Sequence, residues 1–190
     1  KKIFKSKKIW CAASTHNTEE KICATVHQKL KNKYKNLLTI IIPRHTQRTN
    51  DIIKEIETMG LKVQTHSSNF NINKKTEIYL VDTYGETKSF FRICKTVFLG
   101  GSIINHGRQN PLEPVRLGCK VLHGPYIQNF TETYKLLNKN NLSFNFNTTN
   151  QLIRLINNSF KQKQRFTNKI IKLKKIGSSI LNHTLGEINY

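Results

Sequence analysis

The sequence predicts an α/β fold in which a Rossmann-like parallel sheet carries helices on both faces. Short apolar runs alternate with amphipathic segments along most of the chain, and this alternation is typical of parallel strands joined by helices. The run from Leu37 to Ile42 is almost continuously apolar, as in a strand that is covered on both faces. The length of 190 residues suits one domain of this kind.

The first half of the chain is expected to contain four strands and two helices. Lys8 to Ala13 predicts the first strand, and Asn17 with Glu20 resembles an N-cap and capping-box carboxylate at the start of a helix. We expect residues 37–42 to form the central strand, and Gly60 to end the second helix in the left-handed conformation. The remaining elements are expected as helices at 18–33 and 50–59 and strands at 61–65 and 77–81.

The second half continues the alternation. Thr96 to Leu99 predicts a strand that runs into two glycines, and Pro111 opens a helix that Gly118 closes. The remaining elements are expected as helices at 87–94, 130–138 and 149–158 and a strand at 120–123. Apolar residues keep a helical period beyond that point. The chain is therefore expected to form one nucleotide-binding domain over 1–160 and a C-terminal helix over 161–190 that packs on it.

The chain is strongly basic, with 32 Lys and Arg against 11 Asp and Glu and a formal net charge of +21. Such a charge attracts phosphates, nucleic acid and anionic membrane surfaces. The lysines are scattered instead of forming one stripe, and no RNA-binding signature is present, so a generally basic surface is favoured over nucleic-acid binding. The basic segment 161–175 has an apolar face, which favours packing on its own domain over contact with a membrane.

The cysteines and histidines indicate neither a disulfide framework nor a metal site. The four cysteines lie far apart without CxxC spacing and are typical of reduced core residues in a cytosolic protein. Four histidines near expected strand ends fit no zinc-binding spacing; they are His16, His45, His106 and His123. The longest apolar run is far shorter than the roughly 20 residues of a membrane span. The chain enters a strand early without an initiator Met, so we expect a fragment of a longer protein.

Four of the expected strand ends carry polar residues in place of ordinary turns. These loops are residues 14–16, 43–45, 82–86 and 105–113. In a parallel sheet they converge on the edge where ligands bind. Hydroxyls, helix-start amides, an Arg and a carboxylate together suit a nucleotide, because phosphate is bound by N–H groups and cations while ribose hydroxyls bind carboxylates.

The last of these loops carries a family resemblance. From Gly100 the chain reads GGSIINHGRQNPLEPVRLGCKVLHGPYIQNF, which is similar to the pattern GGSLxxxGGHNPLEPAxxGxPVxxGPxxxNF of bacterial lipopolysaccharide transferases of 3-deoxy-D-manno-octulosonic acid (Kdo). Three earlier segments agree in order and spacing: ASTH with the following EE resembles ASTHxGEE, PRH resembles PRHPER, and DTYGE resembles DTMGEL. The resemblance runs through most of residues 8–137.

This resemblance implies a GT-B glycosyltransferase, in which two Rossmann-like domains face each other across a cleft. The chain would be the C-terminal, donor-binding half, and the N-terminal acceptor domain would lie outside it. The donor would be CMP-Kdo, and the acceptor would be a lipid A precursor bound through the N-terminal domain. The enzyme would work at the cytoplasmic face of the bacterial inner membrane, anchored by its N-terminal part, with the anionic membrane surface as a further partner.

The resemblance also implies an inverting transfer without a metal ion and without a cofactor. The general base would be a carboxylate of the N-terminal domain, so no catalytic residue is expected here and the isolated chain is expected to bind nucleotide weakly without turnover. The contribution of this chain would be to stabilise the CMP leaving group through Arg44 and helix N-termini.

The matching positions give the expected donor site. Arg44 would bind the phosphate, Glu113 the ribose hydroxyls, and the loop at 84–86 would flank the nucleoside. Ser14 and Thr15 would hold the phosphate or the Kdo carboxylate. The full set is Ser14, Thr15, Pro43, Arg44, Tyr84, Gly85, Glu86, Asn110, Pro111, Leu112 and Glu113.

Two other hypotheses compete with this functional interpretation. Within the resemblance, Arg108 and Gln109 replace the Gly and His of the family pattern, and Gln109 cannot be protonated as His can. A GT-B transferase that uses UDP or another nucleotide sugar is therefore one alternative. The other, from a different class, is a basic, non-catalytic module that binds nucleic acid.

Overall fold

A computed structural model describes residues 6–68, 71–105 and 109–161. It contains one sheet of seven strands, all parallel, in the order β3-β4-β2-β1-β5-β6-β7. The strands are β1 (Lys8–Thr15), β2 (Leu37–Pro43), β3 (Val63–Thr65), β4 (Ile78–Leu80), β5 (Thr96–Leu99), β6 (Lys120–His123) and β7 (Ser143–Asn145). The predicted parallel sheet is confirmed.

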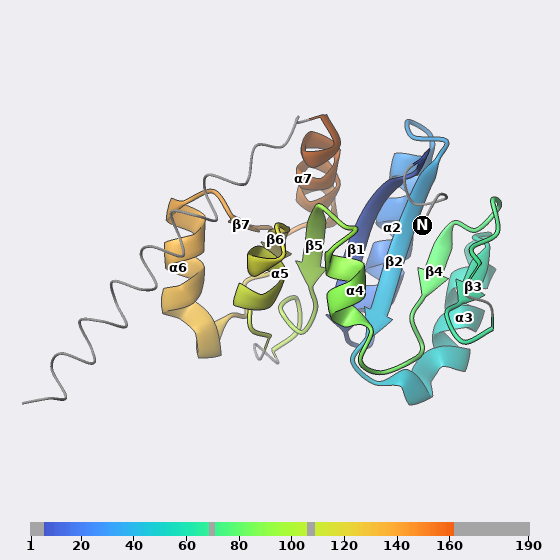
Figure 1. Cartoon of the computed structure of the whole chain (residues 1–190), viewed down its shortest axis with the longest axis horizontal. Helices are drawn as coiled ribbons and strands as arrows, with labels where there is room; N and C mark the ends of the chain where they lie inside the picture. The colour runs from blue at the N-terminus through green and yellow to red at the C-terminus, as the bar shows by residue number, and fades with distance from the viewer. Residues whose placement is uncertain (1–5, 69–70, 106–108, 162–190) are drawn as a thin grey trace, which may run out of the picture.

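Helices cover both faces of the sheet, as predicted (Figure 1). On one face, α2, α3 and α7 bury residues such as Val26, Ile56 and Leu152 against the strands. On the other face, α4, α5 and α6 bury Phe90, Val115 and Leu137. The helices are α2 (Glu19–Lys31), α3 (Thr49–Thr58), α4 (Thr87–Phe91), α5 (Leu112–Arg116), α6 (Thr131–Lys139) and α7 (Thr149–Lys161), with 3-10 turns η1 (Thr46–Arg48) and η2 (Gln128–Phe130).

Strand β1 lies at the centre of the sheet, because it pairs with β2 on one side and β5 on the other. The expectation that residues 37–42 form the central strand was therefore wrong by one position, although β2 is buried along its whole length. The chain builds outward from β1 to β2, then returns and builds outward from β5 to β7. The carboxyl ends of β1 and β5 thus form the topological switch point, where such folds bind ligands.

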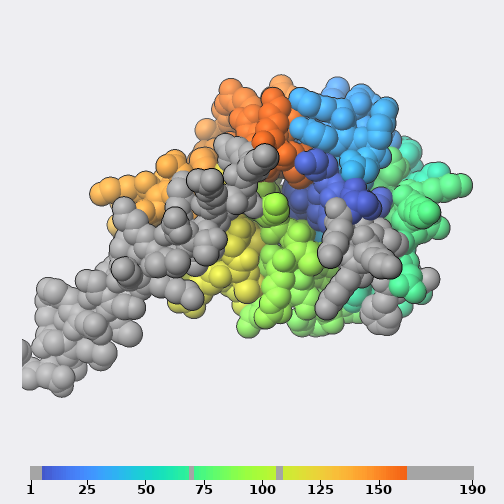
Figure 2. Space-filling model, turned by 45° about the horizontal axis from the view of Figure 1, so that its top comes forward, coloured from blue at the N-terminus to red at the C-terminus, as the bar shows by residue number. Residues whose placement is uncertain are grey.

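Helix α7 lies against the end of α2. Figure 2 shows the orange atoms of α7 beside the light-blue atoms that follow α2, and the Tyr34 hydroxyl donates to Asn157 Oδ1 at 2.8 Å. This contact joins residues 123 positions apart. Helix α7 therefore packs against the rest of the described chain, while the predicted helix over 161–190 lies outside the described residues apart from Lys161.

Within the described ranges, no helix has both the length and the apolar character needed to cross a membrane.

Candidate functional site

The four polar loops singled out in the sequence follow strands of one parallel sheet and therefore lie at its carboxyl edge. The loops after β1 and β2 meet where the Arg44 N–H donates to the Thr15 carbonyl at 2.9 Å. Helix α4, which follows the loop after β4, approaches the start of α5 where Lys88 Nζ lies 3.4 Å from Glu113 Oε1. The loops after β1 and β5 are joined by the side chain of Glu19. Each predicted segment therefore contributes to one edge.

The end of β1 has an irregular backbone. The pairing with β2 shifts register between Ala13 and Thr15, and Ser14 has a φ of 57°, in the left-handed region. Thr15 is fully buried, and among the described residues its hydroxyl oxygen has no hydrogen-bond partner. A buried hydroxyl without a partner at a strand end is uncommon.

Glu19, at the first position of α2, is fully buried. Its Oε2 accepts the N–H groups of His16 at 2.9 Å and Gly101 at 2.8 Å, and its Oε1 accepts the N–H of Ile103 at 3.2 Å. Burial raises the pKa of Glu19, while these three donors act in the opposite direction. The carboxylate therefore ties the loops on the two sides of the switch point together.

Glu20 is also fully buried and forms a two-point ion pair with Arg48, at 3.1 and 3.2 Å. The predicted capping box, in which Glu20 would serve Asn17, was wrong. Glu19 takes the corresponding role one position earlier by accepting the His16 N–H. Glu20 points instead to η1, so it anchors α2 to the segment that follows β2.

The loop after β5 can adopt its position only with a glycine at residue 100. A Cβ added to Gly100 would lie 2.5 Å from the Ser14 carbonyl oxygen and 2.6 Å from Glu19 Oε2, well inside van der Waals contact. On its other side this loop binds the loop after β6, because Ser102 Oγ accepts the Gly124 N–H at 2.9 Å and the Ser102 carbonyl accepts the Tyr126 N–H at 3.0 Å. A narrow hollow here is lined by Gly100, Gly101, Ser102, Gln109, Tyr126, Ile127 and Tyr134.

After β2, Pro43 is buried and Arg44 is exposed. The side chain of Arg44 is therefore on the surface of the carboxyl edge, and its backbone N–H bonds the Thr15 carbonyl. The rings of His16 and His45 meet edge to face at 5.7 Å between centroids. This loop thus presents a cation at the position where the sequence predicted a phosphate contact.

After β4, Tyr84 is 73% exposed and Gly85 has a φ of 86°. An exposed aromatic ring offers a surface on which a nucleobase could stack. Glu86 is the N-cap residue of α4, and its carbonyl accepts the Ser89 N–H at 2.9 Å. Asp82 is already engaged, because its carboxylate accepts the Ser67 N–H and hydroxyl.

Helix α5 begins within the Asn-Pro-Leu-Glu segment. Asn110 is exposed, and its Oδ1 accepts the Leu112 N–H at 2.9 Å, while Pro111 is buried at the N-cap. The side chain of Glu113 is 45% exposed and, within the part of the chain that the structure describes, its ion pair is with exposed Lys88. Such pairs contribute about 0–1 kcal/mol, so Glu113 can exchange this partner for ligand hydroxyls. Arg108 of the signature loop lies outside the described residues.

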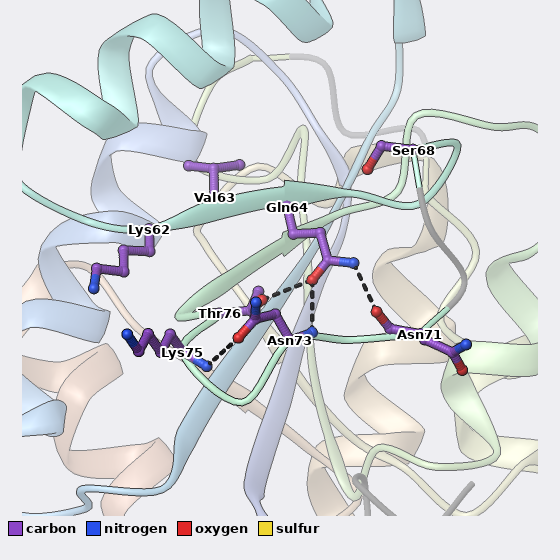
Figure 3. Close-up of a pocket in the computed structure, with 8 residues that line it drawn as sticks. All are labelled: Lys62, Val63, Gln64, Ser68, Asn71, Asn73, Lys75 and Thr76. Carbon is purple, nitrogen blue, oxygen red and sulfur yellow. Dashed lines mark hydrogen bonds between the residues drawn. The ribbon is translucent and has the colours of Figure 1, made fainter.

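A larger surface hollow lies elsewhere, beside the edge strand β3 (Figure 3). Gln64 organises it: Oε1 accepts the Asn73 N–H at 2.9 Å and the Thr76 hydroxyl at 2.7 Å, and Nε2 donates to the Asn71 carbonyl at 3.1 Å. These bonds fold the following loop back along the sheet edge. The hollow contains none of the residues predicted for the donor site.

Among the described residues, no group of three or more His, Cys, Asp or Glu side chains is arranged to hold a metal ion. His123 is buried and packs its ring against Tyr134 at 4.3 Å between centroids. His106 lies outside the described residues.

The fold is that of a Rossmann-like domain of the GT-B type. The solved C-terminal CMP-Kdo binding domain of WaaA from Acinetobacter baumannii superposes with a TM-score of 0.83 and 22% identity, covering 91% of this chain and 90% of that one. A trehalose 6-phosphate synthase from Burkholderia multivorans shares the fold more distantly, with a TM-score of 0.59 and 9% identity over 98% of this chain and 45% of that one.

The sequence narrows this class to one family. A 3-deoxy-D-manno-octulosonic acid transferase from Haemophilus influenzae is 37% identical over 129 residues, which are 68% of this chain and 30% of that protein. No protein-family profile matches the chain. The chain is a homologue of the Kdo transferases, and its fold is that of their C-terminal domain. It spans less than half the length of the curated relatives that it matches.

Proposed function

We propose that this chain is the donor-binding domain of a Kdo transferase of lipopolysaccharide biosynthesis and that it holds CMP-Kdo at the carboxyl edge of its sheet. The observation that carries the proposal is that four polar loops follow parallel strands at this edge, with Arg44 exposed and Glu113 paired with an exposed lysine. The match of the solved CMP-Kdo binding domain over nine-tenths of its length supports the fold on which the proposal rests.

Every predicted residue other than Pro43, which is buried at the end of β2, has a proposed task. The exposed guanidinium of Arg44 binds the phosphate. The hydroxyl of partly buried Ser14 contributes to the same anion site, and buried Thr15 fixes the neighbouring backbone. Tyr84 stacks on the cytosine ring, flanked by Gly85 and Glu86. The site is closed by the segment Asn110, Pro111, Leu112 and Glu113. The Glu113 carboxylate accepts hydrogen bonds from the ribose hydroxyls.

We propose further that the transfer inverts the anomeric centre and needs neither a metal ion nor a cofactor. The chain stabilises the charge that develops on the CMP leaving group, with Arg44 next to the phosphate. The acceptor, a lipid A precursor, and the general base belong to an N-terminal domain that anchors the enzyme at the cytoplasmic face of the inner membrane. The basic surface of this chain then faces anionic lipid headgroups. On this proposal the 190-residue chain binds donor but does not transfer sugar.

Titration with CMP, UMP and single-stranded RNA at two salt concentrations tests the proposal. We expect saturable binding of CMP, weaker binding of UMP, and a loss of about ten- to a hundredfold in CMP affinity in Glu113→Ala. A carboxylate that accepts hydrogen bonds from two hydroxyls contributes about 1.5–3 kcal/mol. Glu132→Ala is the matched control, since Glu132 is an exposed carboxylate on α6 that also pairs with a lysine. It should leave CMP affinity unchanged.

Other outcomes identify the alternatives. Preference for UMP over CMP would indicate a transferase for a different nucleotide sugar. Salt-sensitive binding of RNA without nucleotide selectivity would falsify the proposal and favour a nucleic-acid-binding module.

A further inference from the structure

The carboxylate of Glu19 occupies the point between the ends of β1 and β5. It is fully buried, and it accepts N–H groups from the loop before α2 and from two residues of the loop after β5. Among the described residues Glu19 forms no ion pair, whereas its neighbour Glu20 pairs with Arg48. Glu19 is therefore a buried acid satisfied by backbone amides.

This arrangement matters because of where the amides lie. In Rossmann-like folds, backbone N–H groups at the switch point commonly bind a phosphate of the ligand. Here the N–H groups of Gly101 and Ile103 already donate to Glu19, at 2.8 and 3.2 Å. A phosphate brought to the same place would meet a carboxylate of like charge in a buried setting, which is strongly unfavourable.

The loops after β1 and β5 pack closely around the Glu19 carboxylate. The space beside Gly100 contains both the Ser14 carbonyl oxygen and Glu19 Oε2, so that no Cβ can be added there. The same Ser14 has a left-handed backbone, and the next residue, Thr15, receives the Arg44 N–H on its carbonyl. The position of the β5 loop is thus linked through Glu19 to the two loops that carry the predicted phosphate contacts.

We infer that Glu19 is a positioning residue of the donor site. Its carboxylate takes the anion position at the switch point, fixes the β5 loop against the β1 loop, and leaves the donor phosphate to the outer side of the edge, where Arg44 is exposed. The inference rests on the proposed function, namely that a nucleotide binds at this edge.

Glu19→Gln tests the inference with almost no change in shape. The amide nitrogen that replaces one carboxylate oxygen cannot accept an N–H, so at least one of the three bonds is lost. We expect amide hydrogen exchange at Gly101 or Ile103, followed by NMR, to become faster by about tenfold, and CMP affinity to fall by a similar factor. Glu20→Gln is the matched control, because Glu20 is equally buried one position along but bonds Arg48. It should leave exchange at Gly101 and Ile103 unchanged.

Glu19→Ala with added formate gives a second test. Formate can occupy the space of the missing carboxylate and accept the same N–H groups, so we expect it to restore slow exchange and CMP affinity in Glu19→Ala while leaving the unsubstituted chain unaffected. A purely structural role would lower the melting temperature without a change in CMP affinity for the fraction that remains folded.

The outcomes separate this inference from the proposed function. If the unsubstituted chain does not bind CMP, the proposed function fails, and with it the role of Glu19 in the donor site, although amide exchange would still report the link between the loops. If CMP binds equally well to the unsubstituted chain and to Glu19→Gln, the donor site stands and the inference is overturned. Loss of the folded state in both variants without recovery in formate would assign Glu19 to folding and overturn it too.

Discussion

At the scale of single residues, the site depends on close approaches that only particular side chains allow. Gly100 and Gly60 make a matched pair for a test. An added Cβ at Gly100 would meet the Ser14 carbonyl oxygen at 2.5 Å, whereas at Gly60 it would meet nothing within 4 Å. Gly60 has a φ of +74°, so its substitution costs only the backbone strain of about 1–2 kcal/mol.

We therefore expect Gly100→Ala to lower the free energy of unfolding more than Gly60→Ala does. Overpacking of a rigid backbone contact costs about 1–3 kcal/mol, and at Gly100 it also displaces the Glu19 carboxylate. Urea denaturation of the two variants measures the difference. Gly100→Ala should in addition weaken CMP binding, whereas Gly60→Ala should not. Equal stability losses in the two variants would contradict the steric explanation.

Because His27 is buried, we expect the fold to lose stability in acid. It is buried in α2 and bonds the Thr39 hydroxyl at 2.8 Å, and burial lowers the pKa of His27 from 6.5 to about 4, opposed by Glu77 and reinforced by Lys31 and Lys7. Between these two pKa values the unfolded chain binds a proton that the folded chain does not. The free energy of unfolding should therefore fall as the pH drops from about 6.5 to 4, by up to about 1.4 kcal/mol per unit.

Denaturant titrations of the unsubstituted chain and of His27→Gln at several pH values measure this effect. The variant lacks the titrating ring, so its stability should depend less steeply on pH in that window. The carboxyl of Glu77, whose pKa is lowered by the Lys62 N–H and by Lys31 although burial raises it, adds a loss of stability at lower pH in both proteins. An identical slope above pH 4.5 in both proteins would contradict a role for His27.

At the scale of elements, α2 is held to the rest of the edge by the ion pair of Glu20 with Arg48. Glu20 is fully buried, while the side chain of Arg48 is 24% exposed. Arg48→Ala would leave a buried carboxylate without its cation, which costs about 3–5 kcal/mol. Arg48→Ala combined with Glu20→Gln removes the uncompensated charge as well.

We expect the double variant to be more stable than Arg48→Ala alone, because the penalty comes from the unpaired charge and not from the lost attraction. Thermal unfolding of the two single variants and the double variant completes the cycle. If the double variant loses the sum of the two single losses, Glu20 and Arg48 act independently and this account is wrong.

The helices and strands were easier to predict from the sequence than the site was. Long apolar or amphipathic runs such as residues 8–13 and 37–42 gave β1 and β2 to within two residues. Strand β7 was missed, because Ser143–Asn145 is short and polar and is defined by pairing with β6 instead of by its own pattern. The centre of the sheet was misplaced since burial of β2 on both faces does not reveal its order in the sheet.

The site was predictable where loops follow strands and less so where side chains bridge them. Parallel topology alone predicts that residues 14–16, 43–45, 82–86 and 105–113 share one edge. That Glu19 would bond the β5 loop 82 positions away could not be deduced, because the adjacent carboxylates Glu19 and Glu20 look alike in sequence. The family resemblance includes both, but it does not assign them different partners.

At the scale of the whole molecule, the net charge of +21 attracts any anion. Binding at a specific site must be stronger than this general attraction. A single nucleotide carries few charges, and screening acts over about 10 Å at 0.1 M salt. Nucleic acid engages many charges at once, so its binding falls steeply with salt. The salt dependence of binding therefore distinguishes a defined phosphate contact from general attraction by a basic surface.

On this basis we expect CMP affinity to fall less than about tenfold between roughly 0.05 and 0.5 M salt, because one phosphate interacts with few cations. Arg44→Ala should remove most of the affinity gained from the phosphate, which is measured by comparing CMP with cytidine. Arg154→Ala, an exposed arginine on α7, controls for the loss of one positive charge and should have no effect. If Arg44→Ala and Arg154→Ala weaken CMP binding equally, the phosphate is attracted by the net charge of the molecule, and the carboxyl edge is not its site.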